Sequence, residues 1–312
     1  MKRTIAAFLS IIFFLIIGLP SMIVWGSIKE NEETRLLLPK NKKAAVKDRS
    51  ITLKQGNKLI RLDLDEYLQG VIAGEMPAGF ALEALKAQAI AARTYALKQT
   101  AYGSKAISSD FKRSQAWISE AEMKKRWGAD YPVNRERIRQ AVLATKGEVL
   151  FYQGELISAY YHSTCGGRTA SSEEVFGQRL PYLEGVECYW DKKSLRYHDA
   201  KTLSLAALQE KLKLSGSGVS LKVIKRTKSG RIAEIKINDK SFTGREIRSL
   251  LGLRSAAFTW KTEEGKITFY TTGYGHGVGL CQFGANGLAK EGRDAHTILR
   301  HYYPGCEVVS LK

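Results

Sequence analysis

The chain has 312 residues, with 49 lysines and arginines against 31 aspartates and glutamates, which gives a net charge of +18 at pH 7. The positive residues are scattered rather than gathered in one stripe with interleaved aromatics, which argues against nucleic acid as the partner and leaves anionic wall polymers, a membrane surface or simple solubility. The sequence contains no heptads, solenoid period or low-complexity tract, so coiled-coil and repeat classes are excluded.

An uncharged, apolar run from Thr4 to about Gly26 dominates the N-terminus. Its roughly 22 residues suffice to cross a ~30 Å hydrocarbon layer as a helix. Because Lys2 and Arg3 precede the run and several glutamates follow it, we expect a single-pass cell-membrane anchor with a cytoplasmic N-terminus and an extracytoplasmic C-terminal region. A cleaved signal peptide is the alternative, although no A-x-A site follows the run.

Composition divides the rest of the chain into a tether and a folded region. After an anchor over residues 1–27, residues 28–50 are mostly polar and highly charged, which predicts a flexible linker. Residues 51–312 are long enough for a substantial core in one large or two modest domains. We allow for a smaller subdomain at about residues 200–272.

Hairpin and helix patterns follow one another through the folded region without a regular βαβ order. A Gly56-Asn57 turn signal between alternating runs predicts a hairpin over residues 51–64. The other expected elements are helices over 80–99, 134–145, 203–214 and 242–253, an irregular subregion with a short helix over 108–134, a hairpin over 148–163, strands over 219–227 and 231–238, and a strand entering a glycine loop over 266–279. This mixture predicts an α+β fold.

The helix that should follow the first hairpin carries the first candidate functional residue. Asp63 is placed to cap its start, and Pro77 disfavours helical geometry at the preceding residue, so the helix should end beside Glu75. Glu75 lies eleven residues after Leu64, and at about 100° per residue it returns to the apolar face. Burial and the negative helix end both raise the pKa of a glutamate, so Glu75 could donate a proton near neutral pH. The alternative is a solvated carboxylate at a frayed helix end.

The alanine-rich helix over residues 80–99 supplies possible partners for Glu75. Lys86 and Arg93 are seven residues apart and share one face, whereas Gln88 and Tyr95 share a nearly opposite face. Only one pair can therefore face Glu75 directly. A basic side chain of the first pair could instead form an ion pair with Glu75, or extend to the surface as such residues ordinarily do.

The stretch YYHSTCGGRT, residues 160–169, is polar and glycine-rich and follows a strand, where ligand-contacting loops are common. His162 and Cys165 could begin a metal site with Cys188, but two or three ligands do not make a specific zinc signature. A Cys165–His162 hydrolase dyad is a further alternative, for which no orienting third residue can be assigned.

The stretch GYGHGVGLCQFGANG, residues 273–287, lacks both the P-loop and the dinucleotide-binding pattern. Its glycines predict that the backbone closely approaches a ligand or another segment of the chain. His276 and Gln282 are the candidate ligand contacts, and satisfied structural polar groups are the alternative.

Four cysteines in an exported region permit disulfides. Of the three possible pairings, Cys165–Cys188 with Cys281–Cys306 closes the most local loops, and we expect that pairing if disulfides form.

Four extended motifs, GEMP, LEALKAQAIAARTYAL, YYHSTCGGRT and GYGHGVGLCQFGANGLAKEG, follow one another behind the N-terminal anchor. In this order they closely resemble the stage II sporulation protein D family, which includes amidase-enhancer proteins, and the resemblance covers residues 51–312. It implies a membrane-anchored lytic transglycosylase with a fold unlike that of lysozyme. Such an enzyme cleaves the β-1,4 bond between N-acetylmuramic acid and N-acetylglucosamine in denuded peptidoglycan and leaves 1,6-anhydro ends during forespore engulfment.

The resemblance also implies roles for residues and partners. Glu75 in GEMP matches the family's catalytic glutamate. The implied partners are stage II sporulation protein P, an amidase/endopeptidase, and the membrane protein stage II sporulation protein M, with the chain in the mother-cell membrane facing the septal wall. No cofactor is expected: some family members bind a structural zinc through differing ligands, which His162 and Cys165 match only loosely. The side chains expected to contact glycan or to orient Glu75 are Lys86, Gln88, Arg93, Tyr95, His162, Ser163, Thr164, His276 and Gln282.

Two functions of other classes compete with the enzyme. A glycan-binding protein could enhance a partner amidase without cutting glycan itself, as the enhancer branch of the family suggests. A basic scaffold could simply tether membrane to wall.

Overall fold

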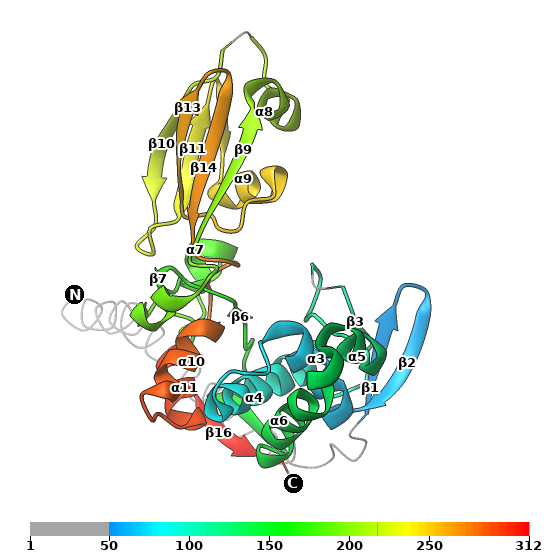
Figure 1. Ribbon diagram of the computed structural model, residues 1–312. Helices are drawn as coiled ribbons and strands as arrows, with labels where there is room; N and C mark the ends of the chain where they lie inside the picture. The colour runs from blue at the N-terminus through cyan, green and yellow to red at the C-terminus, as the bar shows by residue number, and fades with distance from the viewer. Residues whose placement is uncertain (1–49, 111, 217, 312) are drawn as a thin grey trace, which may run out of the picture. The chain divides into compact units, whose positions relative to one another are not determined.

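The computed structural model describes residues 50–110, 112–216 and 218–311, which belong to one compact unit (Figure 1). The predicted anchor lies outside these residues, as does the predicted linker except for its last residue. Within the described chain, none of the helices combines the length and the apolar character that a membrane span requires.

Helices packed around α4 form the centre of the first hydrophobic core. Helix α4 contacts four other helices: α3, α6, α10 and α11. Twelve of its 18 residues are buried. Small alanine side chains let neighbouring helices approach closely, which explains why the predicted helix over residues 80–99 is almost surrounded. The helices are α3 (Leu64–Glu75), α4 (Leu82–Gln99), α5 (Glu120–Trp127), α6 (Tyr131–Ala144), α7 (Ser172–Phe176), α10 (Gln282–Lys290) and α11 (Ala295–Tyr302).

Short sheets flank these helices. The predicted hairpin over residues 51–64 is confirmed as the antiparallel pair β1–β2, and β3 adds to β1 in parallel. The hairpin predicted over 148–163 stops early: β4 lies between β5 and β16, and the chain then leaves so that β6 pairs in parallel with β15. The strands are β1 (Ser50–Gln55), β2 (Lys58–Asp63), β3 (Ile107–Ser108), β4 (Glu148–Tyr152), β5 (Glu155–Leu156), β6 (Tyr161–His162), β7 (Gly167–Arg168), β8 (Glu187–Cys188), β15 (Leu280–Cys281) and β16 (Glu307–Ser310).

A second hydrophobic core lies between residues 203 and 269 and includes Ile235, Ile247 and Phe269. Two antiparallel three-stranded sheets, β10–β11–β12 and β13–β14–β9, enclose it together with two short helices, in the yellow-green to orange part of Figure 1. The elements are β9 (His198–Ser204), α8 (Leu205–Leu212), β10 (Leu221–Arg226), β11 (Ile232–Ile237), β12 (Lys240–Phe242), α9 (Gly244–Leu251), β13 (Phe258–Glu263) and β14 (Lys266–Thr272). Mixed helices and antiparallel strands make the fold α+β, as predicted.

Candidate active site

The end of α3 positions the Glu75 carboxylate. Asp63 caps the start of the helix by accepting a hydrogen bond from the Asp65 amide at 2.8 Å. The helix ends at Glu75 because Met76 is extended (φ −124°, ψ 148°), which is the geometry that the following Pro77 favours. The predicted end of the helix is therefore confirmed, and the side chain of its last residue is only partly exposed.

Two donors hold the Glu75 carboxylate. The backbone amide of Ala116 donates to Oε1 at 2.7 Å, and the side-chain amide of Gln282, which is buried, donates to Oε2 at 3.4 Å. Burial raises the pKa of Glu75, and these two hydrogen bonds oppose the rise without cancelling it. The predicted rise in pKa is thus confirmed, and desolvation is its principal cause.

Tyrosines surround this carboxylate. Burial raises the pKa of Tyr95 and Tyr161, and a charge on Glu75 raises both pKa values further. Burial likewise raises the pKa of Tyr67, with smaller contributions from Tyr95 and Glu75. All three phenols therefore stay neutral at physiological pH.

Gln115 links the wall of tyrosines to the segment that binds Glu75. Its Oε1 accepts from the Tyr67 hydroxyl at 2.9 Å, and its Nε2 donates to the Tyr161 hydroxyl at 2.7 Å and to the carbonyl of Ala92 at 3.2 Å. Because Gln115 is buried and immediately precedes Ala116, this network fixes the backbone amide that donates to Glu75.

The two faces of α4 have different roles. Tyr95 lies near Glu75 and within 6.5 Å, between ring centroids, of Tyr161. Arg93 is directed elsewhere: its guanidinium donates to the carbonyls of Val142 and Glu148 at 3.2 Å and pairs with Asp65.

Lys86 forms an ion pair with Glu83 at 2.8 Å. Neither Lys86 nor Arg93 therefore forms the ion pair with Glu75 that was the alternative interpretation. Gln88 is completely buried, and neither of its amide atoms has a hydrogen-bond partner within the described residues.

The loop residues predicted to contact substrate form a second group. His162 is buried, and its Nδ1 lies 3.1 Å from the carbonyl oxygen of Val278; its ring centroid is 5.6 Å from that of partly exposed His276. Ser163 contributes its carbonyl to the amide of Phe283, next to Gln282. Thr164 is buried, and its hydroxyl lies 3.0 Å from that of Ser194.

The four cysteines are all free and buried, so the predicted disulfide pairing is wrong in this structure. The reason is their placement: Cys281 lies with Cys165 and Cys188, and Asp191 completes the group. The alternative of a Cys165–His162 hydrolase dyad is not supported, because the His162 Nδ1 atom is engaged by a backbone carbonyl and the Cys165 thiol donates to Asp191 at 3.0 Å.

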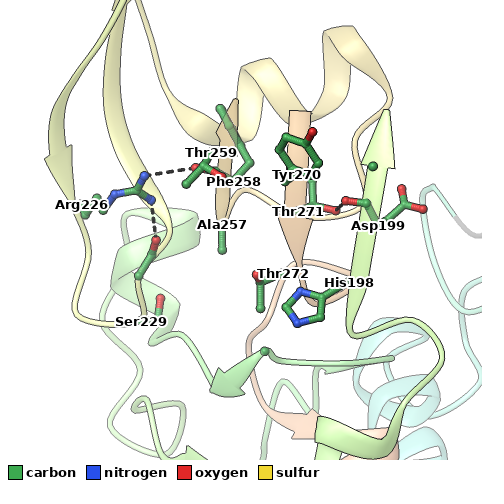
Figure 2. Close-up of a pocket in the computed structure, with 13 residues that line it drawn as sticks. His198, Asp199, Arg226, Ser229, Ala257, Phe258, Thr259, Tyr270, Thr271 and Thr272 are labelled. Atoms are coloured by element: carbon green, nitrogen blue, oxygen red, sulfur yellow. Dashed lines mark hydrogen bonds between the residues drawn. The ribbon is translucent and has the colours of Figure 1, made fainter. Parts of the chain in front are cut away.

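A pocket of about 710 Å³ lies on the sheets of the second core and does not contain Glu75 (Figure 2). His198, Arg226 and Tyr270 are among its lining residues. Arg226 is already engaged, since its guanidinium donates to the carbonyls of Gly230 and Phe258 at 2.9 and 3.1 Å. We therefore place the candidate active site at the carboxylate rather than at this pocket.

Two family models match the chain, one in the part that forms the first core and one around the part that forms the second core. The family described as stage II sporulation protein matches residues 53–152, and a domain of unknown function matches residues 184–279. Stage II sporulation protein D of Bacillus subtilis (strain 168) is 42% identical over 255 residues, which cover 79% of this chain and 74% of that protein. The chain belongs to the stage II sporulation protein D family.

Other relatives agree with this assignment. Stage II sporulation protein D of Bacillus amyloliquefaciens is 40% identical over 79% of this chain and 74% of its own length. The amidase enhancer of Bacillus subtilis (strain 168) is 30% identical over 78% of this chain but only 40% of its own length. The family resemblance predicted from the four motifs is therefore confirmed.

The sequence of this member of the stage II sporulation protein D family did not predict that residues 114–118 form one side of the site. Gln115 and Ala116 lie in a segment without helix or strand periodicity, and Ala116 acts through its backbone amide. Only the polar Gln115, before the apolar Ala116 and Trp117, offered a signal. Asp191 was also missed: it follows Cys188 by three residues, but the other two cysteines near it lie 26 and 90 residues away.

Proposed function

We propose that this chain is a membrane-anchored peptidoglycan lytic transglycosylase that uses Glu75 as its catalytic acid and base. Its substrate would be the bond between N-acetylmuramic acid and N-acetylglucosamine in denuded glycan strands, cleaved during forespore engulfment. The observation that carries the proposal is a partly buried carboxylate with a raised pKa, held by two hydrogen-bond donors.

Among the residues that the structure describes, no second acid interacts with Glu75, which favours this reaction over hydrolysis. Ordinary glycosidases use two carboxylates, one as the acid and one as the nucleophile or the base for water. Within the described residues, none of the recorded hydrogen bonds or charges that affect Glu75 comes from another carboxylate. A lytic transglycosylase needs one carboxylate, because the C6 hydroxyl of the sugar replaces water as the nucleophile.

The proposed reaction moves one proton onto the leaving group and one back onto the enzyme. Protonated Glu75 donates to the glycosidic oxygen as the bond from C1 to that oxygen breaks. The C6 oxygen then bonds to C1, and the Glu75 carboxylate accepts the hydroxyl proton. Ala116 and Gln282 would stabilise the carboxylate between the two transfers and keep it oriented.

Localisation and partners are part of the same proposal. We place the enzyme in the mother-cell membrane with its folded region facing the septal wall. There, an amidase/endopeptidase such as stage II sporulation protein P would supply denuded strands, and stage II sporulation protein M would be a membrane partner. Family membership supports a role in sporulation.

Digestion of denuded glycan strands by the purified full-length protein tests the enzymatic proposal. We expect 1,6-anhydro ends, detected by mass spectrometry. Glu75→Gln should lower their rate of formation by about 10²- to 10⁴-fold, the usual contribution of a positioned acid or base, while strand binding persists. Glu66→Gln is the matched control, since Glu66 is exposed on the same helix, and it should leave the rate unchanged.

The same experiment separates the competing functions. If the wild-type protein binds strands and accelerates a partner amidase but produces no anhydro ends, the glycan-binding enhancer is correct. Unchanged turnover in Glu75→Gln would remove this residue from the mechanism.

A further inference from the structure

Two arginines on α9 lie beside an aromatic patch formed by Tyr160, Phe176 and His276. Arg245 and Arg248 are three residues apart on this helix, so they share one side of it. We propose that they bind the lactyl carboxylate of a peptide-free N-acetylmuramic acid, and that the aromatic patch packs against the sugar that carries it. This inference rests on the proposed function, since it names the residues through which the enzyme would select denuded strands.

The guanidinium groups of this pair still have donors to offer. Arg245 is exposed, and its guanidinium donates to the carbonyl of Val175 at 3.4 Å. Arg248 is partly exposed, and its Nε donates to the carbonyl of Arg254 at 3.1 Å. Among the residues that the structure describes, no carboxylate forms an ion pair with either side chain. Like charges three residues apart on a helix repel each other, so an anion bound between the two would relieve that repulsion.

The partly buried position of Arg248 favours the binding of an anion. Burial lowers the pKa of this guanidinium, and the charge of Arg245 contributes to the same effect. An arginine nevertheless stays charged at physiological pH. With less water around it, the guanidinium forms a stronger hydrogen bond to a carboxylate, which it can bind through two parallel N–H donors.

A third arginine near His276 has a structural role instead. Arg231 is 3% exposed and donates to the carbonyl of Cys165 at 2.9 Å, so a ligand cannot reach it. Burial lowers the pKa of His276 well below its usual range, and the neighbouring His162, Arg248 and Arg231 lower it further. His276 is therefore neutral at physiological pH, and it contributes an aromatic ring to the patch rather than a charge.

Two more arginines extend the positive charge around the ring of Tyr274. The Cζ atoms of Arg196 and Arg254 lie 5.2 and 5.4 Å from its centroid. Arg254 forms an ion pair with Asp199 at 3.2 Å, which neutralises it. The pair on α9 is thus better placed than Arg254 to receive an external carboxylate.

Aromatic rings connect the arginine pair to Glu75. Tyr95 lies near Glu75, and its ring centroid is 6.0 Å from that of Tyr160. The Tyr160 ring is 5.0 Å from Phe176 and 6.0 Å from His276, and the Cζ atom of an α9 arginine lies 5.8 Å from the Phe176 ring. None of these four rings is buried, and Phe176 is 37% exposed. Exposed rings next to polar groups suit sugars, whose C–H faces pack on aromatic faces. The pair would therefore bind a sugar other than the one cut beside Glu75.

The chemistry of the lactyl group explains why this contact would distinguish denuded strands. While a stem peptide is attached, the lactyl carboxyl is part of a neutral amide. Removal of the peptide leaves a carboxylate. A guanidinium forms its strong, charge-assisted hydrogen bonds only with the carboxylate. The arginine pair would thus bind strands after the amidase has acted on them.

Binding of glycan oligosaccharides to full-length Glu75→Gln in detergent tests the inference without turnover. One ligand is a denuded tetrasaccharide, and the other is the same compound with its lactyl carboxylates converted to methylamides. We expect the denuded compound to bind about 10- to 100-fold more tightly, the usual effect of a hydrogen bond between charged groups.

Variants made in the same Glu75→Gln protein assign that preference to α9. The double variant Arg245→Gln/Arg248→Gln should bind both ligands about equally. Arg245→Gln alone should reduce the preference, and it replaces an exposed side chain, so it serves if the double variant fails to fold. Arg139→Gln is the matched control: it removes the same charge from an exposed position on α6, where Arg139 pairs with Glu136, and it should keep the preference.

Three results would overturn the inference. These are equal binding of both ligands by the Glu75→Gln protein, a full preference that persists in the α9 variants, and an equal loss of preference in Arg139→Gln, which would make net charge the cause. Failure of the proposed enzymatic function gives a different result. In that case the wild-type protein would form no anhydro ends, while the preference for the denuded ligand would remain.

Discussion

The pKa of Glu75 is raised because its carboxylate lies in a partly buried environment at the end of α3. Pro77 makes α3 end at Glu75, and the carboxylate lies among tyrosines that remain neutral. The two donors from Ala116 and Gln282 limit the rise in pKa. A stronger set of donors would hold the ionised form and remove the acid that the proposed reaction requires.

The raised pKa of Glu75 predicts a pH-dependent difference in stability. The unfolded chain loses this proton near pH 4.3, whereas the folded protein retains it to a higher pH, so the folded state loses relative stability as pH rises through the folded pKa. Glu75→Gln lacks that loss. The free energy of unfolding of Glu75→Gln, relative to that of the wild type, should therefore increase between pH 4 and pH 8 by about 1.4 kcal/mol per unit of pKa shift.

Urea denaturation of both proteins at several pH values measures this difference. A difference that stays constant across the range would mean that Glu75 titrates normally, and would contradict its proposed role as an acid at neutral pH.

Individual residues of the site differed in how far the sequence could predict them. The spacing from Leu64 and the position of Pro77 were enough to place Glu75, since both act within one helix. The donors were harder, because the Ala116 amide belongs to the backbone and Gln282 comes from 207 residues away. On α4, spacing defined two faces, and only tertiary packing selected the face with Tyr95.

Packing between α3 and the segment around Trp117 positions the Ala116 amide. Gly70 and Gly74 lie on the side of α3 that this segment covers. A Cβ at Gly74 would lie 3.1 Å from the Ala116 carbonyl oxygen, and one at Gly70 would lie 2.2 Å from the Trp117 indole nitrogen. The two glycines therefore permit a close approach, which a Cβ at Gly70 would prevent.

Gly70→Ala tests this contact between elements. Alanine favours an interior helix position over glycine by about 1 kcal/mol, but the clash with Trp117 should outweigh that gain and destabilise the protein by about 1–3 kcal/mol. The control is Gly79→Ala, where an added Cβ meets no atom within 4 Å. Urea denaturation gives both values; a stabilised Gly70→Ala variant would show that the segment packs differently.

Whole elements were predictable where a pattern ran without interruption. The helix predicted over residues 80–99 is observed over Leu82–Gln99. In contrast, no helix was predicted where α10 lies, in a stretch that contains Gly284 and Gly287. In the structure these glycines accommodate Cys188 and Trp190 against a regular helix.

The net charge of +18 belongs to the whole molecule rather than to one site. It predicts that association with anionic cell-wall polymers weakens as salt screens the charges, with the Debye length falling from about 10 Å at 0.1 M to about 3 Å at 1 M. Pelleting of the full-length protein with purified wall should decrease over this range. Glu75→Gln should pellet like the wild type. If pelleting does not change with salt, the charge contributes to solubility alone.

The second core is formed by a stretch of chain that begins and ends at the same place. His198 at the start of β9 is paired with Thr272 at the end of β14, so the two positions are neighbours across one strand spacing of about 5 Å. A short turn could therefore replace the whole stretch, so a gene could gain or lose it in a single event. Loss of the stretch would also remove Arg231 from beside the clustered cysteines.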